Sequence, residues 1–234
     1  MTPFVLKGWR VTGYVQENVE GVRIRMARAA ERAGRDPGTV RLVAVTKSTD
    51  VSGIRAAYEA GLREFGENRV ADAADKLAQV DDLRRSTTWH LVGHLQRNKV
   101  QAAIGLFDII ESVDSERLAE RIDRLALTPF PVLLEVNISR EQAKHGFDYD
   151  TIEEAARRIQ RCTNIDVRGL MTMAPKVDNP EEVRPFFRAV RDIGRILGVE
   201  EISMGMTNDF EVAIEEGATM VRVGRAIFSK RNGF

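Results

Sequence analysis

The sequence predicts an α/β protein folded as a single TIM-like (β/α)8 barrel. Short apolar runs alternate with segments of helical periodicity along the chain. Eight of these runs qualify as strands, namely Arg41–Thr46, Leu62–Gly66, Thr88–Val92, Phe107–Glu111, Pro131–Asn137, Val167–Thr172, Glu201–Met206 and Thr219–Gly224. A length of 234 residues suits one such barrel, so we expect a single domain over residues 1–234. A doubly wound open sheet has the same alternation and stays the alternative.

An additional amphipathic helix is predicted ahead of the first strand. Its apolar stripe consists of Val19, Val22, Met26, Ala29 and Ala33. We expect this helix to cover one end of the barrel. Residues 1–15 precede the stripe and are predicted to form a peripheral N-terminal extension of the same domain.

Two later helices carry start signals. In the segment DSERLAERIDRLA, Leu118 and Ile122 share an apolar face behind a Ser115 cap. After the sixth predicted strand, Asn179 supplies an N-cap followed by a first-turn proline. Pro185 is a candidate kink position in that helix.

Composition excludes several classes of function. Thirty-five basic residues offset thirty-five acidic ones, so no global positive field attracts nucleic acid or an anionic membrane. The N-terminus lacks the apolar core of a signal peptide, and no later run is long enough for a membrane span. Cys162 is the single cysteine, so no intrachain disulfide can form and a reducing compartment fits. We expect a cytoplasmic monomer without a nucleic-acid or membrane partner.

The first predicted strand delivers a lysine at its tip. The segment RLVAVTK is an apolar run rich in β-branched residues that ends at Lys47. In a low-dielectric cavity the ammonium form is disfavoured, so a free amine able to attack a carbonyl is available near neutral pH. Most lysines at strand ends simply face solvent, so the assignment depends on the rest of the site.

The seventh and eighth predicted strands end in loops suited to phosphate binding. In a (β/α)8 barrel, functional residues sit at the C-terminal ends of strands, and the last two such loops commonly bind a phosphate. SMGMTND contains Gly205 and Thr207, and RVGRA contains Arg222 and Gly224. The glycines let backbone N–H groups come close, the threonine offers a hydroxyl, and the arginine adds a cation. Tight turns and a helix cap explain the same residues equally well.

A carbonyl-reactive lysine facing a phosphate site suggests a short list of ligands. One is pyridoxal phosphate, whose aldehyde reacts with amines. The other is a sugar phosphate bound by a Schiff-base aldolase.

Six sequence blocks occur in an order typical of one known family. They are AVTK (44–47), FGEN (65–68), WHLVGHLQRNK (89–99), GLMTM (169–173), SMGMTND (203–209) and RVGRAIF (222–228). Through these blocks the chain resembles the pyridoxal-phosphate homeostasis family, the YggS/PROSC-type binding proteins, from about residue 41 almost to the C-terminus. The resemblance implies a fold type III barrel like the N-terminal domain of alanine racemase. It also implies that pyridoxal phosphate is held as an imine on Lys47.

The same resemblance assigns the other cofactor contacts. It places Ser203, Thr207, Gly224 and the Arg225 amide at the phosphate, and makes Arg222 a candidate neighbour of the pyridine nitrogen. An arginine there would disfavour protonation of the ring nitrogen and weaken the cofactor as an electron sink. The threonine stands where serine is usual, and Arg225 where many members have threonine. We therefore rely on the backbone N–H of Arg225 and not on its guanidinium.

Two further residues are candidates for the cofactor site. Asn68, at the tip of the second strand, could contact the ring, and capping of the next helix is an equal alternative. His90 points into the barrel and could lie beside the cofactor, with a buried structural histidine as the equal alternative. His94 and His145 share no guaranteed face with it, so no metal site is predicted. The cluster Arg97–Lys99 lacks aromatic neighbours and is best explained as a solvated helix face.

Two functions remain in competition. The first is a non-catalytic carrier and regulator that serves intracellular pyridoxal-phosphate homeostasis and supplies apo-enzymes. The second is an amino-acid racemase, which needs an acid or base on each face of its substrate. Alanine racemases take one of these groups from an additional domain and a partner subunit, for which we expect no residues left here. No catalytic residue is therefore predicted, and an aldolase fits less well than either.

Overall fold

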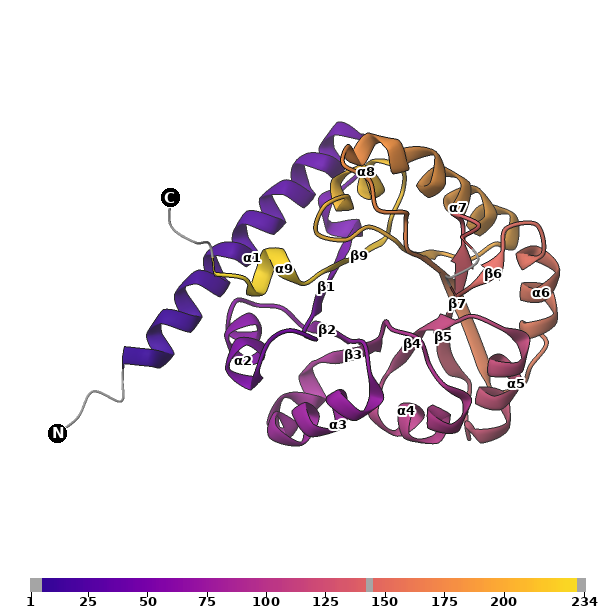
Figure 1. Ribbon diagram of the computed structural model, residues 1–234, viewed down its shortest axis with the longest axis horizontal. Coiled ribbons are helices and arrows are strands. Elements are labelled where there is room, and N and C mark those ends of the chain that lie inside the picture. Colours follow the sequence, from indigo (N-terminus) through magenta and orange to yellow (C-terminus); the bar gives the residue numbers. More distant parts are fainter. Residues whose placement is uncertain (1–5, 142–144, 231–234) are drawn as a thin grey trace.

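The computed structural model describes residues 6–141 and 145–230, with side chains from residue 13 onward. It forms a closed barrel of parallel strands surrounded by helices (Figure 1). Strands neighbour one another in the order β4, β3, β2, β1, β9, β8, β7, β5, and a β4–β5 pairing closes the ring. The (β/α)8 prediction is confirmed, because an open sheet would lack this closing pair.

All eight predicted strands are present with ends shifted by a few residues. Their bounds are β1 (Arg41–Val45), β2 (Glu64–Glu67), β3 (Thr88–Leu91), β4 (Ile109–Val113), β5 (Phe130–Asn137), β7 (Ile165–Thr172), β8 (Glu201–Ser203) and β9 (Met220–Val223). A short unpredicted strand, β6 (Phe147–Asp148), pairs with β5 outside the ring. Two residues are too few to carry a periodic signal.

Helices follow the strands as the alternation predicts. The α-helices are α1 (Leu6–Arg32), α2 (Val51–Glu59), α3 (Val70–Gln79), α4 (Val100–Leu106), α5 (Glu116–Leu125), α6 (Ile152–Ile159), α7 (Arg184–Leu197), α8 (Phe210–Glu215) and α9 (Arg225–Phe228). The 3-10 helices are η1 (Pro37–Thr39), η2 (Asp81–Ser86), η3 (Arg97–Lys99) and η4 (Pro180–Val183). Within the described ranges, none of these helices combines the length and apolarity needed to cross a membrane.

The N-terminal helix α1 packs on the side of the barrel and not on its end. It contacts α2, α8 and α9 through a buried stripe that includes Val19 and Met26. Ala33, predicted on the same stripe, is exposed because the helix ends one residue earlier. The last helix α9 has only four residues, so α1 completes the helical layer outside β1 and β9 (Figure 1). Residues 6–15 of the expected extension belong to α1, whereas residues 1–5 lie outside the described part.

The two expected helix starts differ in detail from their predictions. Ser115 precedes α5, but its hydroxyl donates to Asp114 and not to the helix backbone. The Asn179 side chain accepts from the backbone N–H of Glu181 and caps η4. Pro185 falls in the first turn of α7, where its missing N–H loses no helical hydrogen bond, so it does not kink the helix.

The barrel has an apolar outer layer and a mixed interior. Most buried apolar side chains lie between strands and helices, including Phe65 and Trp89, whose rings stack with centroids 5.2 Å apart. Ile109, Leu133 and Met171 form a separate small cluster. Because side chains alternate along a strand, the next inward positions of β4 and β5 are glutamates 111 and 135. The interior therefore becomes polar toward the C-terminal ends of the strands.

One glycine of the GLMTM block has a structural role. Gly169 pairs with Glu201 in the β7–β8 ladder. A Cβ atom at Gly169 would lie 1.7 Å from the carbonyl oxygen of Glu201. The close approach of these two strands at the start of β8 thus requires glycine.

Candidate functional site

A cleft of about 850 Å³ opens at the C-terminal ends of the strands. Its walls come from the segments that follow β1, β7, β8 and β9. The cleft is lined by Lys47, Thr207, Arg222, Gly224 and Arg225. Five of the eight predicted cofactor-binding residues, from three separate sequence blocks, are therefore brought together. The volume lies within the range typical of small-molecule sites.

Lys47 is exposed at the edge of this cleft. It lies two residues after the end of β1, in a turn before α2. Its side chain makes no hydrogen bond or ion pair within the described ranges. The expected enclosure of this amine in a low-dielectric cavity is thus wrong for the protein alone. The amine is instead accessible to solvent, so a ligand that enters the cleft can reach it.

A second lysine holds the end of β1 in place. Lys76 of α3 donates to the backbone oxygen of Thr46 and to Oε1 of Glu67, both at 2.7 Å. The Thr46 hydroxyl donates to the same carboxylate at 2.6 Å. Because the Glu67 carboxylate is buried, this ion pair fixes the residue next to Lys47. Sequence reasoning missed Lys76, which lies in the last turn of α3 and belongs to no motif.

The loop after β8 has the shape expected of an anion-binding turn. Gly205 has a φ of +90°, and a Cβ atom there would lie 2.5 Å from Cβ of Ala213. The backbone N–H groups of Thr207 and Asn208 have no acceptor in the described part of the chain. Asp209 accepts from the backbone N–H of residue 206 at 2.6 Å, and burial raises the pKa of its carboxyl.

The turn after β9 forms the facing wall. A Cβ atom at Gly224 would lie 3.0 Å from the carbonyl oxygen of Val45, so this turn closes tightly against β1. The backbone N–H of Arg225, the first residue of α9, has no acceptor within the described ranges. The guanidinium of Arg225 is exposed and donates to Oδ1 of Asn208 at 3.4 Å. The backbone N–H of Arg225 is thus free to donate, and its predicted contact with a phosphate stays a prediction.

Arg222 forms the buried floor of the cleft. Its Nη1 donates to the Ser203 hydroxyl at 2.6 Å, and its Nη2 donates to the backbone oxygen of Thr172 at 2.8 Å. Ser203 in turn donates to Oε2 of Glu111 at 2.6 Å. Burial lowers the pKa of Arg222, an effect opposed by the negative charges around it, Glu111 first. A fixed cation therefore lies at the base of the cleft.

His90 extends this buried network across the barrel. Its Nδ1 lies 2.7 Å from Oε1 of Glu111, and its Nε2 lies 3.4 Å from Oε2 of Glu64. Burial alone would lower the pKa of His90, but the hydrogen bond to Glu111 and the negative charges of both glutamates outweigh it and raise the pKa to about 9. Burial would likewise raise the pKa of Glu111, and His90, Arg222 and the serine hydroxyl together lower it.

Three predicted residues do not line the cleft. Ser203 and His90 belong to the buried network, so both act on the cleft through Arg222 and not directly. Asn68 packs its backbone against Gly93, where a Cβ atom would lie 2.3 Å from the Asn68 oxygen. Its predicted contact with a cofactor ring stays a prediction.

The cleft also includes a segment that was not predicted. Residues 174–178, after β7, contribute to its wall, and Lys176 there brings a second exposed amine. The position after the sixth predicted strand was an available signal, because every βα loop of a barrel faces the same end. No residue type in this segment, APKVD, indicates ligand binding by itself.

Two of the histidines meet at the far side of the mouth. His94 Nδ1 lies 2.9 Å from Oδ2 of Asp114, and His145 Nδ1 lies 3.6 Å from the same oxygen. The two imidazole rings stack with centroids 3.7 Å apart. His94 and His145 therefore share a face with Asp114, whereas His90, which pairs with Glu111, does not belong to it. The ligand atoms of His94, Asp114 and His145 lie within 4.8 Å of one another, close enough to hold a metal ion, so the predicted absence of a metal site stays a prediction.

The fold and the cleft define a class of barrel. The family described as alanine racemase, N-terminal domain, matches residues 18–232. Alanine racemase from Corynebacterium glutamicum shares the fold at a TM-score of 0.71 with 17% identity. This comparison covers 94% of the present chain and 62% of the racemase chain.

Closer relatives place the chain within that class. Pyridoxal phosphate homeostasis proteins match at 39% identity in Aquifex aeolicus, covering 92% of this chain and 97% of the relative. The relative in Pseudomonas aeruginosa matches at 37%, covering 93% and 96%. The protein PipY of Synechococcus elongatus PCC7942, solved with PLP bound, matches at 35% identity and a TM-score of 0.80, covering 92% and 100%. The chain belongs to the pyridoxal phosphate homeostasis protein family.

Proposed function

We propose that this protein binds pyridoxal phosphate and acts in its homeostasis as a carrier and regulator, not as an enzyme. The observation that carries the proposal is the convergence of Lys47, Thr207, Gly224 and the Arg225 backbone on one cleft above Arg222. The family name of the relatives and the PLP bound to PipY support the same ligand.

The residues of the cleft fit the chemistry of a phosphorylated aldehyde. The backbone N–H groups of Thr207, Asn208 and Arg225 are free donors, and the threonine adds a hydroxyl. Such a set of amides and hydroxyls binds a phosphate dianion through charge-assisted hydrogen bonds. When bound, pyridoxal phosphate supplies an aldehyde that reacts with amines and a ring that withdraws electrons.

Lys47 is the amine best suited to bond with that aldehyde. The three nearby lysines differ in their partners: Lys76 is held by a buried carboxylate, whereas Lys47 and Lys176 are exposed and form no ion pair with any described residue. A lysine in a tight ion pair keeps its proton and is a poor nucleophile. Lys47 lies beside the phosphate loops, at the end of β1, whose neighbour in the barrel is β9.

Arg222 favours a binding role over catalysis. Its guanidinium is a fixed donor, held by Ser203 and the Thr172 carbonyl, with the Glu111 carboxylate oxygen 3.8 Å away. Placed beside the pyridine nitrogen, this cation opposes protonation of the ring. An unprotonated ring draws electrons less strongly and leaves amino-acid protons hard to remove.

Chemical trapping tests the proposed binding. The protein is incubated with pyridoxal phosphate, reduced with borohydride, digested and mapped by mass spectrometry. We expect the adduct on Lys47, its loss in Lys47→Ala, and its retention in the matched variant Lys176→Ala. An adduct on Lys176 or Lys76 in the unaltered protein would contradict the assignment of Lys47.

Cofactor transfer tests the proposed role. The loaded protein should restore activity to an apo-transaminase, because a covalent bond between an amine and an aldehyde is reversible. The same preparation should leave the chirality of L-alanine unchanged over hours. Rapid racemisation without transfer would instead favour a racemase.

A further inference from the structure

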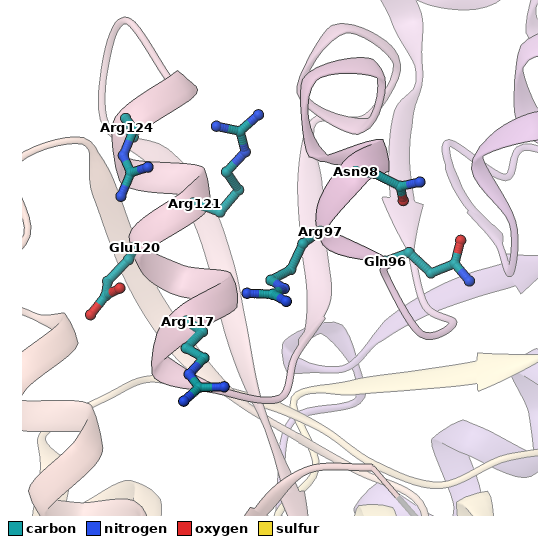
Figure 2. Close-up of a pocket in the computed structure, with 7 residues that line it drawn as sticks. All are labelled: Gln96, Arg97, Asn98, Arg117, Glu120, Arg121 and Arg124. Carbon is teal, nitrogen blue, oxygen red and sulfur yellow. The ribbon is translucent and has the colours of Figure 1, made fainter.

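A second cavity, on the outer wall of the barrel, is lined mainly by arginines. It has a volume of about 770 Å³ and lies between η3 and α5. Arg97 extends from η3 toward α5, while Arg117, Arg121 and Arg124 extend from successive turns of α5 (Figure 2). We call the space between these four residues the arginine groove. It shares no lining residue with the cleft at the barrel mouth.

The guanidinium groups of the arginine groove are free. In the described part of the chain none of the four makes a hydrogen bond or an ion pair. The first-turn acid of α5, Glu116, is already paired with Arg158 of α6 at 2.7 Å. Glu120 is the one acidic residue of the lining, so four positive charges against one negative charge leave a net +3.

This local charge contrasts with the net charge of zero for the whole chain. Like charges that face one another repel and destabilise the fold unless an anion lies between them. The repulsion is relieved by a bound anion, and guanidinium groups bind phosphate oxygens in a bidentate manner.

The spacing of the arginines indicates an extended anion. Arg117, Arg121 and Arg124 are separated by four and three residues and therefore share one face of α5. At a rise of 1.5 Å per residue, the row is about 10 Å long. Arg97 stands on the opposite wall. One phosphate would engage one or two of these groups, so the whole row matches a ligand with several charged groups in line.

The lining excludes other kinds of ligand. Besides the charged residues it contains only the amides Gln96 and Asn98, with no aromatic or aliphatic side chain. Single-stranded nucleic acid needs aromatic platforms for its bases, and protein interfaces need apolar anchors. We propose that the arginine groove binds a short linear polyphosphate, recognised through its charges alone.

Calorimetric titration of the full-length protein tests this proposal with sodium tripolyphosphate as the probe. The titration is run at about 50 mM salt, where exposed charges are weakly screened. We expect tripolyphosphate to bind at least about tenfold more tightly than orthophosphate at matched ionic strength. Arg97→Gln/Arg121→Gln, which removes one arginine from each wall, should weaken binding by roughly tenfold or more.

A matched double variant controls for the loss of charge. Arg157→Gln/Arg161→Gln removes two exposed arginines outside the groove and should leave the affinity unchanged. Neither double variant should unfold below the temperature of the unaltered protein, because the replaced side chains make no hydrogen bond or ion pair within the described ranges. The proposal is overturned by the absence of tripolyphosphate binding, by equal losses in both double variants, or by tighter binding of a duplex RNA at equal phosphate concentration.

Discussion

Two buried glutamates on neighbouring strands of the barrel interior have pKa values that are shifted in opposite directions. Glu111 of β4 accepts hydrogen bonds from His90 and Ser203, and burial, which would raise its pKa, is outweighed so that the pKa is lowered. Glu135 of β5 has no hydrogen-bond partner for its carboxylate in the described part of the chain. Burial, and then the charge of Asp114, raise the pKa of Glu135 to about 7, although Arg222 opposes them.

The difference shows that burial does not by itself determine charge. Both carboxyl groups lie in the same interior, and both are almost inaccessible to water. What separates them is the supply of donors, which β3, β8 and β9 provide for Glu111. One side of the interior is thus a stable ion network beneath the cleft. The other side contains an acid that is half protonated near neutral pH.

The largest expected effect is a loss of stability when Glu111, the hydrogen-bonded glutamate, is replaced. Glu111→Gln removes the counterion of two buried cations, His90 and Arg222. Breaking a buried ion pair on one side leaves an uncompensated charge, so the free energy of unfolding should fall by about 3 to 5 kcal/mol. Urea denaturation at pH 7 measures the loss.

An exposed acid provides the control for this variant. Glu154→Gln removes a carboxylate at the surface of α6, which pairs with Arg158, and should leave stability nearly unchanged. An NMR titration adds a second readout. The pKa of His90, about 9 in the unaltered protein, should fall when Glu111 is replaced, because burial then acts with less opposition. A stable Glu111→Gln protein with an unchanged His90 pKa would contradict the ion network.

A smaller change in the free energy of unfolding, in the stabilising direction, is expected when Glu135 is replaced. An acid whose pKa is higher in the folded state opposes folding as the pH rises, here from about 4.5 toward 7 for Glu135. Glu135→Gln removes that penalty and should stabilise the protein at pH 8 by on the order of 2 kcal/mol. The gain should shrink toward pH 5, where the glutamate is protonated and uncharged.

Thermal unfolding at the two pH values measures this change. The difference in melting temperature between Glu135→Gln and the unaltered protein should be positive at pH 8 and near zero at pH 5. Equal melting temperatures at pH 8 would mean that Glu135 has a partner that compensates its charge.

The smallest expected effect lies at the solvent-exposed rim. Thr207→Ala removes one hydroxyl from a half-buried position of the cleft. A single hydrogen bond of this kind contributes about 1 kcal/mol, so affinity for pyridoxal phosphate should fall roughly fivefold. Thr207→Ser keeps the hydroxyl and should bind as the unaltered protein does. Titrations with pyridoxal, which lacks the phosphate, should show no difference between the two variants.

Much of the fold could be predicted from the sequence, because apolar residues recur with different periods in strands and in helices. Once the eight strands were counted, barrel geometry placed Lys47, Thr207 and Gly224 at the same end. The position of α1 could not be predicted in this way. An amphipathic stripe indicates that a face is buried, but it does not indicate which elements cover that face. Here α1 packs beside β1 and β9 because α9 is too short to cover them.

The interior of the site was harder to predict, because it depends on pairing between distant strands. His90 was expected inside the barrel, and it lies there, but its partner on β4 follows only from the strand register. Lys76 reaches the site from the last turn of α3, where a lysine is common and does not indicate a tertiary contact. Contacts made by long side chains across elements leave no signal in a single sequence.

The seam between β1 and β9 has a consequence for how the protein folds. It pairs Arg41 with Met220, and the Asn18 side chain of α1 donates to the backbone oxygen of Ile227, 209 residues away. During synthesis the ring must therefore stay open until the final strand has left the ribosome. Contacts of such large sequence separation slow folding, since a long loop must close before they form. Until then the edges of β1 and its neighbours are unprotected, and this is the period when the chain is most prone to aggregate.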